Sequence, residues 1–465
     1  MALDLRRGRM RRSLQESLRG AIQEGRLPAG TRLPSSRRLA ADLGVSRGVV
    51  SDTYDQLASE GYLDVEPRSA PVVGAVVPGP PAFVDSVTTS WRYDFIASTP
   101  DVSLFPRRGW IKAIDRAMAV APDDALDYGD HRGRIELRRA LSAYLGRVRG
   151  VRVDPGRIVV TQGFTQALDL LCRVLLARGA TTMAMETPSP TELQQTVRQT
   201  SLRLVGCPVD EHGLQTRELS GLHVDAVCVA PAHQFPTGTV MAPKRRLSLL
   251  QWADAAGALV IEDDYDAEFR YDRTAVGAIQ GLDPSRVVHV GTASKVLAPG
   301  VRLAWMSLPD DFVAEVTLCK GSCDSGSPAI DQLALAELMT SGAYDRHVVR
   351  ARHIYRHRRD TLVTAIARKL PTLHVQGAAA GIHVLLRLPR DSDDDAIAAE
   401  AAGRRIGVRA LSPMHLAHSD ERGLLLGYGR LPERRIPPAL DALASVLADA
   451  GVPKSKRHRR ASAKR

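Results

Sequence analysis

The stretch HVGTASKVLAPGVRLAW, residues 289–305, places a lysine among small residues directly after an apolar run, with an arginine seven positions later. Apolar residues in such a run are typical of a strand that is buried on both faces of a sheet. A lysine that follows the strand lies at its carboxyl end, where open α/β sheets bind ligands. Lys295 is therefore either a solvated surface charge or the anchor of a covalently bound cofactor.

Similar apolar runs alternate with amphipathic stretches from residue 92 onwards. RIVVTQG precedes FTQALDLLCRVLLARG, VDAVCVAP precedes RRLSLLQWADAAG, and ALVIEDDY comes next. This alternation predicts a parallel sheet with helices on both faces and functional groups at the carboxyl ends of its strands. Gly163, Asp263 and Lys295 each come at the end of such a run, so we expect them to meet at one edge of the sheet.

The residues around the lysine can hold a phosphate group. Thr292 and Ser294 offer hydroxyls and Arg302 offers a guanidinium, which together favour a phosphate oxyanion. A second group of backbone N–H donors is expected at the start of the helix after RIVVTQG, where free N–H groups favour an anion. That group comprises Gly163, Phe164 and Thr165.

Two further residues complete the requirements of pyridoxal 5′-phosphate. Asp263 can hold a protonated pyridine nitrogen, and Tyr265 can hydrogen-bond the phenolic oxygen of the ring. Each of these residues alone is more often structural, and a lone EDDY is more often a metal site or a solvated turn. The combination of lysine, phosphate grip, aspartate and tyrosine in one order predicts a pyridoxal phosphate site. We expect no metal site, because CKGSC lacks a second pair of zinc ligands.

The N-terminal residues show a different pattern. Apolar residues at four-residue spacing over 14–22 predict one helix, and Ser35 or Ser36 can cap a second helix that Gly44 ends. Ser46 can cap a third helix, and YLDVEPRSAPVVGAVV then predicts two short strands. Helix, turn, helix and hairpin in this order indicate a winged helix-turn-helix. The alternative is a small helical domain with a solvated arginine face.

The third helix is the predicted recognition helix, which enters the major groove of double-stranded DNA with its N-terminus first. Arg47 opens it, and Gly48 lets the backbone approach the DNA closely. The residues expected to contact operator DNA are Arg32, Ser35, Arg37, Arg38, Ser46, Arg47 and Gly48.

The charge distribution favours the same partner. The net charge is +11, and residues 1–50 hold eleven arginines against four acidic residues. Residues 454–465 hold seven basic residues and no acidic one, so the middle of the chain is mildly acidic. Basic ends suit a polyanion such as DNA, although the tail is equally explained as a disordered solubilising end. With no membrane-spanning run and no signal-peptide core, we expect a cytoplasmic protein.

These patterns predict four segments. Residues 8–77 form the winged helix-turn-helix, and residues 78–91, rich in proline and glycine, form a linker. Residues 92–450 form the large α/β domain, and residues 451–465 are the basic tail.

Longer stretches resemble known families. GTRLPSSRRLAADLGVSRGVVSDTYDQLASEGYL resembles the GntR-type winged helix. VAPAHQFPTGTVM, RRLSLLQWADAAGALVIEDDYDAEFRY and the lysine stretch resemble the MocR/GabR regulators over roughly residues 10 to 450. These regulators fuse a GntR-type winged helix to a fold-type-I aminotransferase-like domain with a small C-terminal α/β subdomain. The resemblance thus implies a multidomain α+β chain with a large domain of the pyridoxal-phosphate-dependent transferase type.

The resemblance also implies roles for particular residues. Lys295 would carry the internal aldimine, with Asp263 on the pyridine nitrogen. The other cofactor contacts would be Tyr265, Arg302, Thr292, Ser294, and, at the ring edge, His233 and Gln234. Tyr128, in YGDHRGRIELRRAL, would reach the partner's phosphate in a head-to-tail homodimer.

The implied function is a transcriptional regulator that senses a small amine or a pyridoxal-phosphate-related effector through an aldimine at Lys295. Effector binding would change the arrangement of the dimer and the DNA geometry that it fits. One alternative is an aminotransferase, complete or partial, with an auxiliary DNA-binding module. The other is a regulator whose large domain holds no cofactor and only dimerises.

Three departures from the family pattern affect these expectations. Pro190 stands where a tyrosine usually stacks on the pyridine ring, which predicts weaker stacking, and Glu192 falls where a cationic effector contact is expected. Leu425 stands where aminotransferases carry an arginine for the substrate carboxylate, so a standard amino-acid substrate is not expected. The possible substitutes are Arg409, Arg422 and Arg430. Finally, Ala70 and Pro71 replace the usual Gly-x-Gly turn and are expected to stiffen the tip of the wing.

Overall fold

The computed structural model describes residues 10–66, 69–74, 90–271 and 276–452. The chain divides into two compact units, Met1–Thr89 and Ser90–Arg465. The predicted basic tail lies outside the described residues apart from Gly451 and Val452.

The first unit is a winged helix-turn-helix. Its helices are α1 (Met10–Gln23), α2 (Ser36–Leu43) and α3 (Arg47–Ser59), and its two strands are β1 (Leu63–Asp64) and β2 (Val72–Val73), which pair antiparallel. A small core of buried apolar side chains, including Leu14, Leu18 and Leu57, joins the three helices. An antiparallel bridge from Arg32 to Val72 adds a third short segment to the wing.

The turn between α2 and α3 is determined by local sequence. Ser35 is the N-cap of α2 and its side chain accepts a hydrogen bond from the Arg38 backbone N–H, 3.3 Å away. Gly44 ends α2 with a positive φ of 65°, a conformation that glycine adopts without strain. Ser46 occupies the N-cap position of α3 but makes no side-chain capping bond, so its predicted role as a capping residue is wrong.

The prediction for the wing also needs correction. Pro71 is buried rather than placed at the exposed tip, and its carbonyl oxygen accepts a hydrogen bond from the Leu33 N–H at 2.8 Å. Pro71 therefore anchors the base of the wing to the segment before α2. Residues 67–68 lie outside the described residues.

The second unit contains an eight-stranded sheet with the order β4-β11-β10-β9-β8-β5-β6-β7. Its strands are β4 (Ile158–Thr161), β5 (Thr182–Thr187), β6 (Arg203–Asp210), β7 (Gly213–Leu214), β8 (Ala226–Val229), β9 (Leu259–Asp264), β10 (Val287–Thr292) and β11 (Ala304–Ser307). β6, β5, β8, β9 and β10 run parallel, as predicted. β11 pairs antiparallel with both β10 and β4, so the sheet is mixed rather than wholly parallel.

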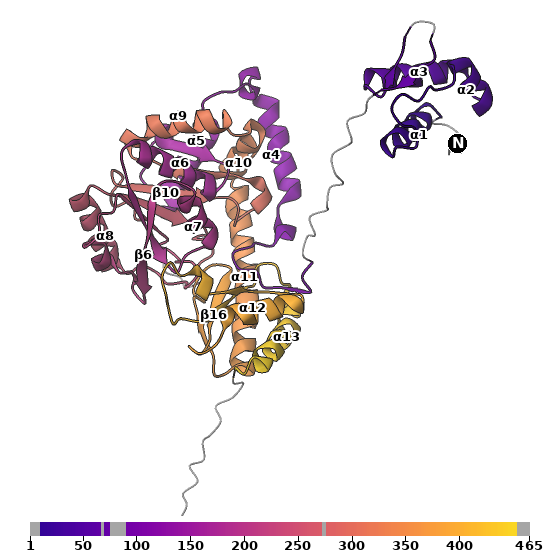
Figure 1. The fold of residues 1–465 in the computed structure, drawn as a ribbon. Coiled ribbons are helices and arrows are strands. Elements are labelled where there is room, and N and C mark those ends of the chain that lie inside the picture. The colour runs from indigo at the N-terminus through magenta and orange to yellow at the C-terminus, as the bar shows by residue number, and fades with distance from the viewer. Residues whose placement is uncertain (1–9, 67–68, 75–89, 272–275, 453–465) are drawn as a thin grey trace, which may run out of the picture. The chain divides into compact units, whose positions relative to one another are not determined.

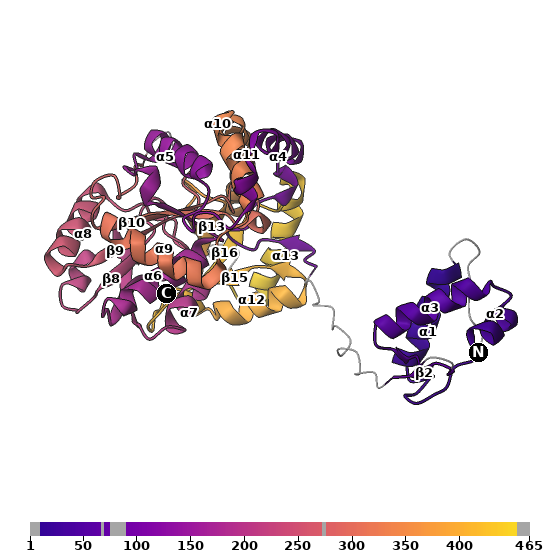
Figure 2. The ribbon, with the colours of Figure 1, turned by 90° about the horizontal axis from the view of Figure 1, so that it is seen from above.

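Helices cover both faces of this sheet (Figures 1 and 2). Alternate strand residues enter different cores: Met183 and Met185 of β5 pack with α6, α7 and α9, whereas Ala184 packs with α8. The helices of the large domain are α4 (Arg107–Val120), α5 (Ile135–Arg149), α6 (Phe164–Ala177), α7 (Thr191–Arg198), α8 (Pro243–Ala256), α9 (Asp310–Asp324) and α10 (Ala329–Thr340). Burial on both faces explains why these strands are apolar throughout.

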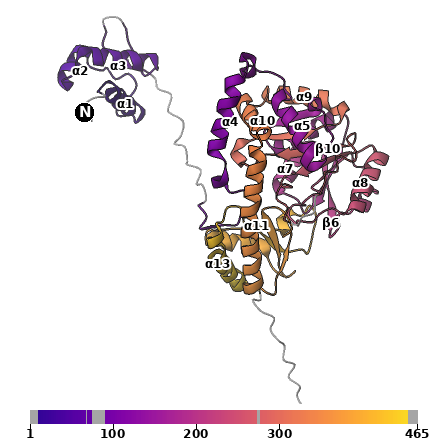
Figure 3. The same cartoon turned by 180° about the vertical axis from the view of Figure 1, so that it is seen from behind.

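A small C-terminal subdomain adjoins the sheet. Its antiparallel strands are β12 (His374–Gln376), β13 (His383–Arg387), β16 (Gly423–Gly427) and β15 (Arg409–Ala410), in that order. It also contains α12 (Asp394–Gly403), α13 (Ile436–Asp449) and β14 (Ile406–Gly407), which pairs with β3 (Tyr93–Asp94). The 27-residue helix α11 (Ala343–Lys369) runs from the sheet region to α13 (Figures 1 and 3).

The remaining elements are short 3₁₀ helices. They are η1 (Val102–Leu104), η2 (Asp123–Leu126), η3 (Pro155–Arg157), η4 (Thr216–Leu219), η5 (Pro299–Val301), η6 (Ser412–Met414) and η7 (Glu433–Arg435). The architecture is that of a winged helix-turn-helix followed by a fold-type-I aminotransferase domain, which confirms the predicted fold class.

Candidate functional site

Lys295 lies in a cavity of about 310 Å³ at the carboxyl ends of β9 and β10, beside the start of α6. Its Nζ donates a hydrogen bond to the Ser98 carbonyl oxygen at 2.8 Å. Burial lowers the pKa of Lys295, and the nearby Asp263 carboxylate opposes this shift. A lysine with a lowered pKa is neutral for more of the time, which is the condition for attack on a carbonyl carbon.

Asp263, the penultimate residue of β9, lines the same cavity. Its Oδ1 is buried and has no hydrogen-bond partner among the described residues. Burial raises the pKa of Asp263 well above its ordinary value, while the Lys295 ammonium lowers it. A buried carboxylate without a donor is costly. A ligand that brings a cationic N–H, such as a protonated pyridine nitrogen, would satisfy it.

The other end of the cavity suits a phosphate. Gly163 is the N-cap of α6 with a φ of 114°, and no side chain caps this helix, so its first backbone N–H groups are available to an anion. The Arg302 guanidinium packs directly on Gly163, because a Cβ at Gly163 would lie 2.7 Å from Arg302 Nη2. Phe164, Thr165, Thr292 and Ser294 line the same cavity. The predicted phosphate residues thus converge on one place.

Of the three remaining predicted cofactor contacts on this side, Tyr265 lies on the cavity wall, and His233 and Gln234 lie behind it. Tyr265 lines the cavity, and its hydroxyl lies 3.0 Å from His233 Nδ1. His233 Nδ1 also lies 3.0 Å from an Asp266 oxygen, so the two residues fix the tyrosine. Gln234 donates to the Pro188 carbonyl oxygen at 2.7 Å. Neither His233 nor Gln234 lines the cavity, which places them behind its wall rather than at the edge of a ligand.

Tyr128 stands apart from this cavity. It comes after η2, is 81% exposed, and lines a different hollow together with Arg134 and Gln332. Within one chain it therefore does not meet Lys295.

Two of the three departures from the family pattern, those at Pro190 and at Leu425, lie in or beside the cavity. Pro190, the N-cap of α7, lines it. Leu425 is fully buried in the apolar cluster that contains Tyr265. Arg409 lies opposite Leu425 on the neighbouring strand β15, lines the cavity, and pairs with Glu192 at 2.7 Å.

The two other candidate arginines are placed elsewhere. Arg430 pairs with Asp94 at 3.0 Å, and Arg422 donates to the Ser419 carbonyl oxygen at 2.6 Å. Neither lines the cavity. The geometry thus selects Arg409 among the three possible substitutes for the missing arginine.

Sequence reasoning missed some of the cavity wall. Phe235 lines it and meets the Tyr265 ring edge-on, with ring centroids 6.3 Å apart. Ser98 contributes its carbonyl oxygen to Lys295 from a position 197 residues earlier. Every residue type carries a backbone carbonyl oxygen, so no sequence signal could have identified Ser98 as the acceptor.

The predicted DNA-binding residues of the first unit lie at its surface. All seven, namely Arg32, Ser35, Arg37, Arg38, Ser46, Arg47 and Gly48, are exposed. No carboxylate of the described residues forms an ion pair with the four arginines. A Cβ added at Gly48 would meet only Ser46 Oγ at 4.0 Å, so the fold itself does not require glycine there. Guanidinium groups around the start of α3 that face no carboxylate suit phosphates and base edges.

Comparison with family models agrees with both units. Residues 11–73 match the bacterial regulatory proteins of the gntR family, and residues 100–423 match aminotransferase class I and II, a pyridoxal-phosphate-binding family. The chain is thus a DNA-binding helix-turn-helix regulator that carries an aminotransferase-like domain.

Its relatives share this organisation over the full length. The HTH-type transcriptional regulator YhdI of Bacillus subtilis (strain 168) is 32% identical over 439 residues, covering 92% of this chain and 93% of the relative. The pyridoxine biosynthesis transcriptional regulator PdxR of Corynebacterium glutamicum is 32% identical and covers 94% of each chain. The probable rhizopine catabolism regulatory protein MocR of Rhizobium meliloti is 30% identical and also covers 94% of each chain. The chain belongs to the MocR family of transcriptional regulators.

Solved structures resemble the second unit. An archaeal alanine:glyoxylate aminotransferase superposes with a TM-score of 0.72 at 28% identity, covering 77% of this chain and 91% of the enzyme. The kynurenine aminotransferase of Pyrococcus horikoshii superposes with a TM-score of 0.71 at 24% identity, covering 78% of this chain and 92% of the enzyme, which shows the shared fold.

Within the described part of the chain, none of the helices combines the length and the apolar character needed to cross a membrane.

Proposed function

We propose that this regulator binds pyridoxal 5′-phosphate at Lys295 and uses the cofactor to sense a small amine, with the winged helix-turn-helix reading the operator. The observation that carries the proposal is one cavity in which Lys295 lies with the unsatisfied Asp263 Oδ1 and the Arg302–Gly163 phosphate grip.

Pyridoxal phosphate, when bound, supplies an aldehyde that condenses with primary amines. Lys295 is the amine that the cavity offers, and its lowered pKa keeps part of it unprotonated. Asp263 would hold the ring nitrogen in its protonated form. Arg302 and the N-terminus of α6 would hold the phosphate, and Tyr265, fixed by His233, would meet the ring oxygen.

Arg409 and Glu192 define the class of effector. They place one cation and one anion on the wall of the cavity, and both charges act on Lys295. An amine that carries an anionic group can replace Glu192 as the partner of Arg409 while its nitrogen approaches Lys295. A molecule related to pyridoxal phosphate is the second class of effector, since one relative, PdxR, is a regulator of pyridoxine biosynthesis.

Signal transmission would use a head-to-tail homodimer. Tyr128 is 81% exposed, and the apolar side chains of Leu126 and Ile111 are 59% and 66% exposed. A second copy that covers these residues would bring Tyr128 to the partner's phosphate site. Effector binding would then change the spacing of the two winged helices and the operator geometry that they fit.

The test is the visible absorbance spectrum of the full chain during titration with pyridoxal phosphate. The wild type and Lys244→Ala, which removes an exposed lysine of α8, are expected to show the same absorbance band. Lys295→Ala is expected to lose it. Asp263→Asn, which keeps the size of the side chain, is expected to weaken binding without removing the lysine.

Two outcomes would overturn the proposal. A wild-type chain without a band at saturating cofactor would make the large domain a dimerisation scaffold. Steady turnover of an amino acid and a keto acid would instead identify a working aminotransferase with an auxiliary DNA-binding module.

A further inference from the structure

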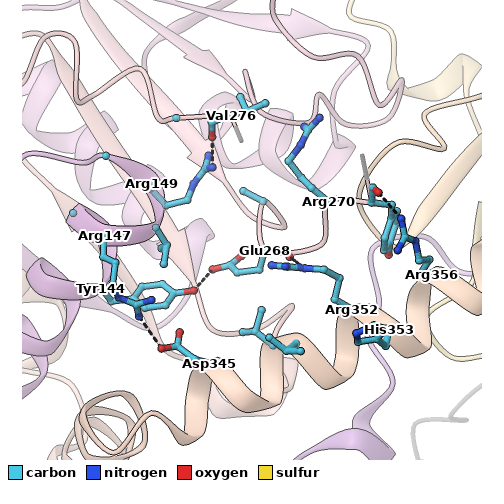
Figure 4. Close-up of a pocket in the computed structure, with 18 residues that line it drawn as sticks. Tyr144, Arg147, Arg149, Glu268, Arg270, Val276, Asp345, Arg352, His353 and Arg356 are labelled. Carbon is cyan, nitrogen blue, oxygen red and sulfur yellow. Dashed lines mark hydrogen bonds and ion pairs between the residues drawn. The ribbon is translucent and has the colours of Figure 1, made fainter. Parts of the chain in front are cut away.

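A second cavity, of about 800 Å³, lies between the last turn of α5, residues 267–271 and 276–277 after β9, and α11. Figure 4 shows its lining, with several arginine side chains around one open space. We call it the α11 pocket, and it shares no described lining residue with the cavity of Lys295. Its volume falls in the range of small-molecule sites, about 300–1,000 Å³.

Three arginines of the α11 pocket have partners other than a ligand. Arg147 pairs with Asp345 at 2.7 Å, and Arg149 pairs with the buried Asp264 at 2.7 Å. Arg270 donates to the Ala232 carbonyl oxygen at 3.1 Å. The two ion pairs therefore leave Arg147 and Arg149 little charge to offer a ligand.

Arg352 and Arg356, one helical turn apart on α11, differ from Arg147 and Arg149. Arg352 Nε donates to the Glu268 carbonyl oxygen at 2.7 Å, and Arg356 Nη2 donates to the Tyr271 carbonyl oxygen at 2.8 Å. These bonds to backbone oxygens fix the two guanidinium groups but do not neutralise them. No carboxylate of residues 10–66, 69–74, 90–271 and 276–452 forms an ion pair with either arginine.

The two acidic side chains of the described lining, Glu268 and Asp345, contact residues other than Arg352 and Arg356. Burial raises the pKa of the Glu268 carboxyl group to about 7, with the Asp264 carboxylate adding to the shift. Its Oε1 lies 3.4 Å from the Tyr144 hydroxyl, on the α5 side of the α11 pocket (Figure 4). Asp345 is occupied by Arg147.

We propose that the α11 pocket binds the phosphate group of a small phosphorylated molecule, held by Arg352 and Arg356. Two fixed guanidinium groups match a dianion, whereas a single carboxylate would neutralise only one of them. The concave wall, with Tyr144 and the apolar Val348, accommodates the organic part of the ligand. Phosphate binding here does not depend on cofactor binding at Lys295, because the two cavities are separate.

The test is direct binding of glycerol 3-phosphate to the full chain, measured by calorimetry or by the phosphorus NMR signal, with inorganic phosphate and neutral glycerol as comparison probes. Direct binding is preferable to thermal shifts, because phosphate also stabilises proteins non-specifically. The variants are Arg356→Gln and Arg352→Gln/Arg356→Gln. Arg350→Gln is the matched control, an exposed arginine of the same helix outside the pocket.

We expect saturable binding of glycerol 3-phosphate that falls by about tenfold or more in both pocket variants, since each loses a charge-assisted hydrogen-bond donor. Binding should persist in Arg350→Gln and in Arg302→Gln, which removes the phosphate grip beside Lys295. If inorganic phosphate binds as tightly as glycerol 3-phosphate, the natural ligand is the free phosphate ion. If it binds more weakly, the natural ligand is an organic phosphate. Neutral glycerol should not bind.

Other results would overturn the proposal. Binding that is unchanged in Arg356→Gln, or lost only in Arg302→Gln, would assign the ligand to the Lys295 cavity. The double variant Arg352→Gln/Arg356→Gln could instead keep glycerol 3-phosphate binding but lower the slope of DNA affinity against salt concentration. A decrease that corresponds to about two phosphate contacts would assign these arginines to the DNA backbone. Failure of the Lys295 proposal would leave these outcomes unaffected.

Discussion

Replacement of Gly163 by alanine tests whether the phosphate grip has the geometry that the structure shows. Gly163 has φ 114° and ψ 167°, a region that is essentially reserved for glycine. An added Cβ would lie 2.7, 3.1 and 3.0 Å from Nη2, Nη1 and Cζ of Arg302. The arginine must therefore move, or the backbone must rotate away from its present conformation.

The two effects have different magnitudes. The backbone conformation alone costs about 1–3 kcal/mol for a residue other than glycine. Displacement of Arg302 would remove the proposed charged hydrogen bond to the phosphate, worth about 1.5–3 kcal/mol. The second effect corresponds to a loss of cofactor affinity of roughly ten- to a hundredfold.

Gly179→Ala is the matched control. Gly179 also has a positive φ, of 88°, but a Cβ there meets nothing within 4 Å. Urea denaturation should show a loss of stability in both variants, of about 1–2 kcal/mol for Gly179→Ala. Titration with pyridoxal phosphate should show weaker binding only in Gly163→Ala. If Gly163→Ala bound the cofactor as tightly as Gly179→Ala, the assignment of Arg302 and Gly163 to the phosphate would be refuted.

Three further predictions concern single contacts. Ser35→Ala should destabilise α2 by about 1 kcal/mol, measured by hydrogen exchange, whereas Ser46→Ala should have little effect because it caps nothing. Burial would raise the pKa of Asp264, but Arg149 holds this pKa well below its ordinary value. The ion pair therefore stabilises the fold at neutral pH, and this stabilisation is lost as the pH falls below about 4. Arg149→Met should cost about 3–5 kcal/mol in urea denaturation at pH 7 and less at pH 3, and an equal cost at both would contradict this reasoning. With pyridoxal phosphate bound, Arg409→Gln should weaken the binding of β-alanine about fivefold in an absorbance titration, because Arg409 lines the cavity. The affinity for propylamine, which has no carboxylate, should not change. An equal loss of affinity for both amines would count against a carboxylate contact.

Local sequence signals predicted the winged helix-turn-helix well. Ser35 and Gly44 act through hydrogen bonds and dihedral angles within a few residues, so their roles are visible in the sequence. The same local logic was insufficient for Ser46, which has the right residue type and position but no capping bond. Pro71 was misplaced for a related reason, because its carbonyl oxygen bonds the N–H of Leu33, which lies far from it in sequence.

The large domain shows the complementary limit. Apolar runs predicted the strands and the carboxyl-end position of Lys295, but strand order is set by pairing between distant segments. β11 comes after β10 in sequence and pairs antiparallel with it, which the runs alone could not distinguish from another parallel crossover.

Arg409 illustrates how that limit affects functional inference. Judged by position in the sequence, Leu425 removes the carboxylate-binding arginine, and Arg409, Arg422 and Arg430 are equal candidates to replace it. In the sheet, Arg409 lies directly across from Leu425 on the adjacent strand, and its side chain lines the cavity of Lys295. A cation can thus be supplied to one point of a pocket from either of two neighbouring strands. The absence of an arginine at position 425 does not by itself leave the cavity wall without a cation, because the register of β15 and β16 places Arg409 there.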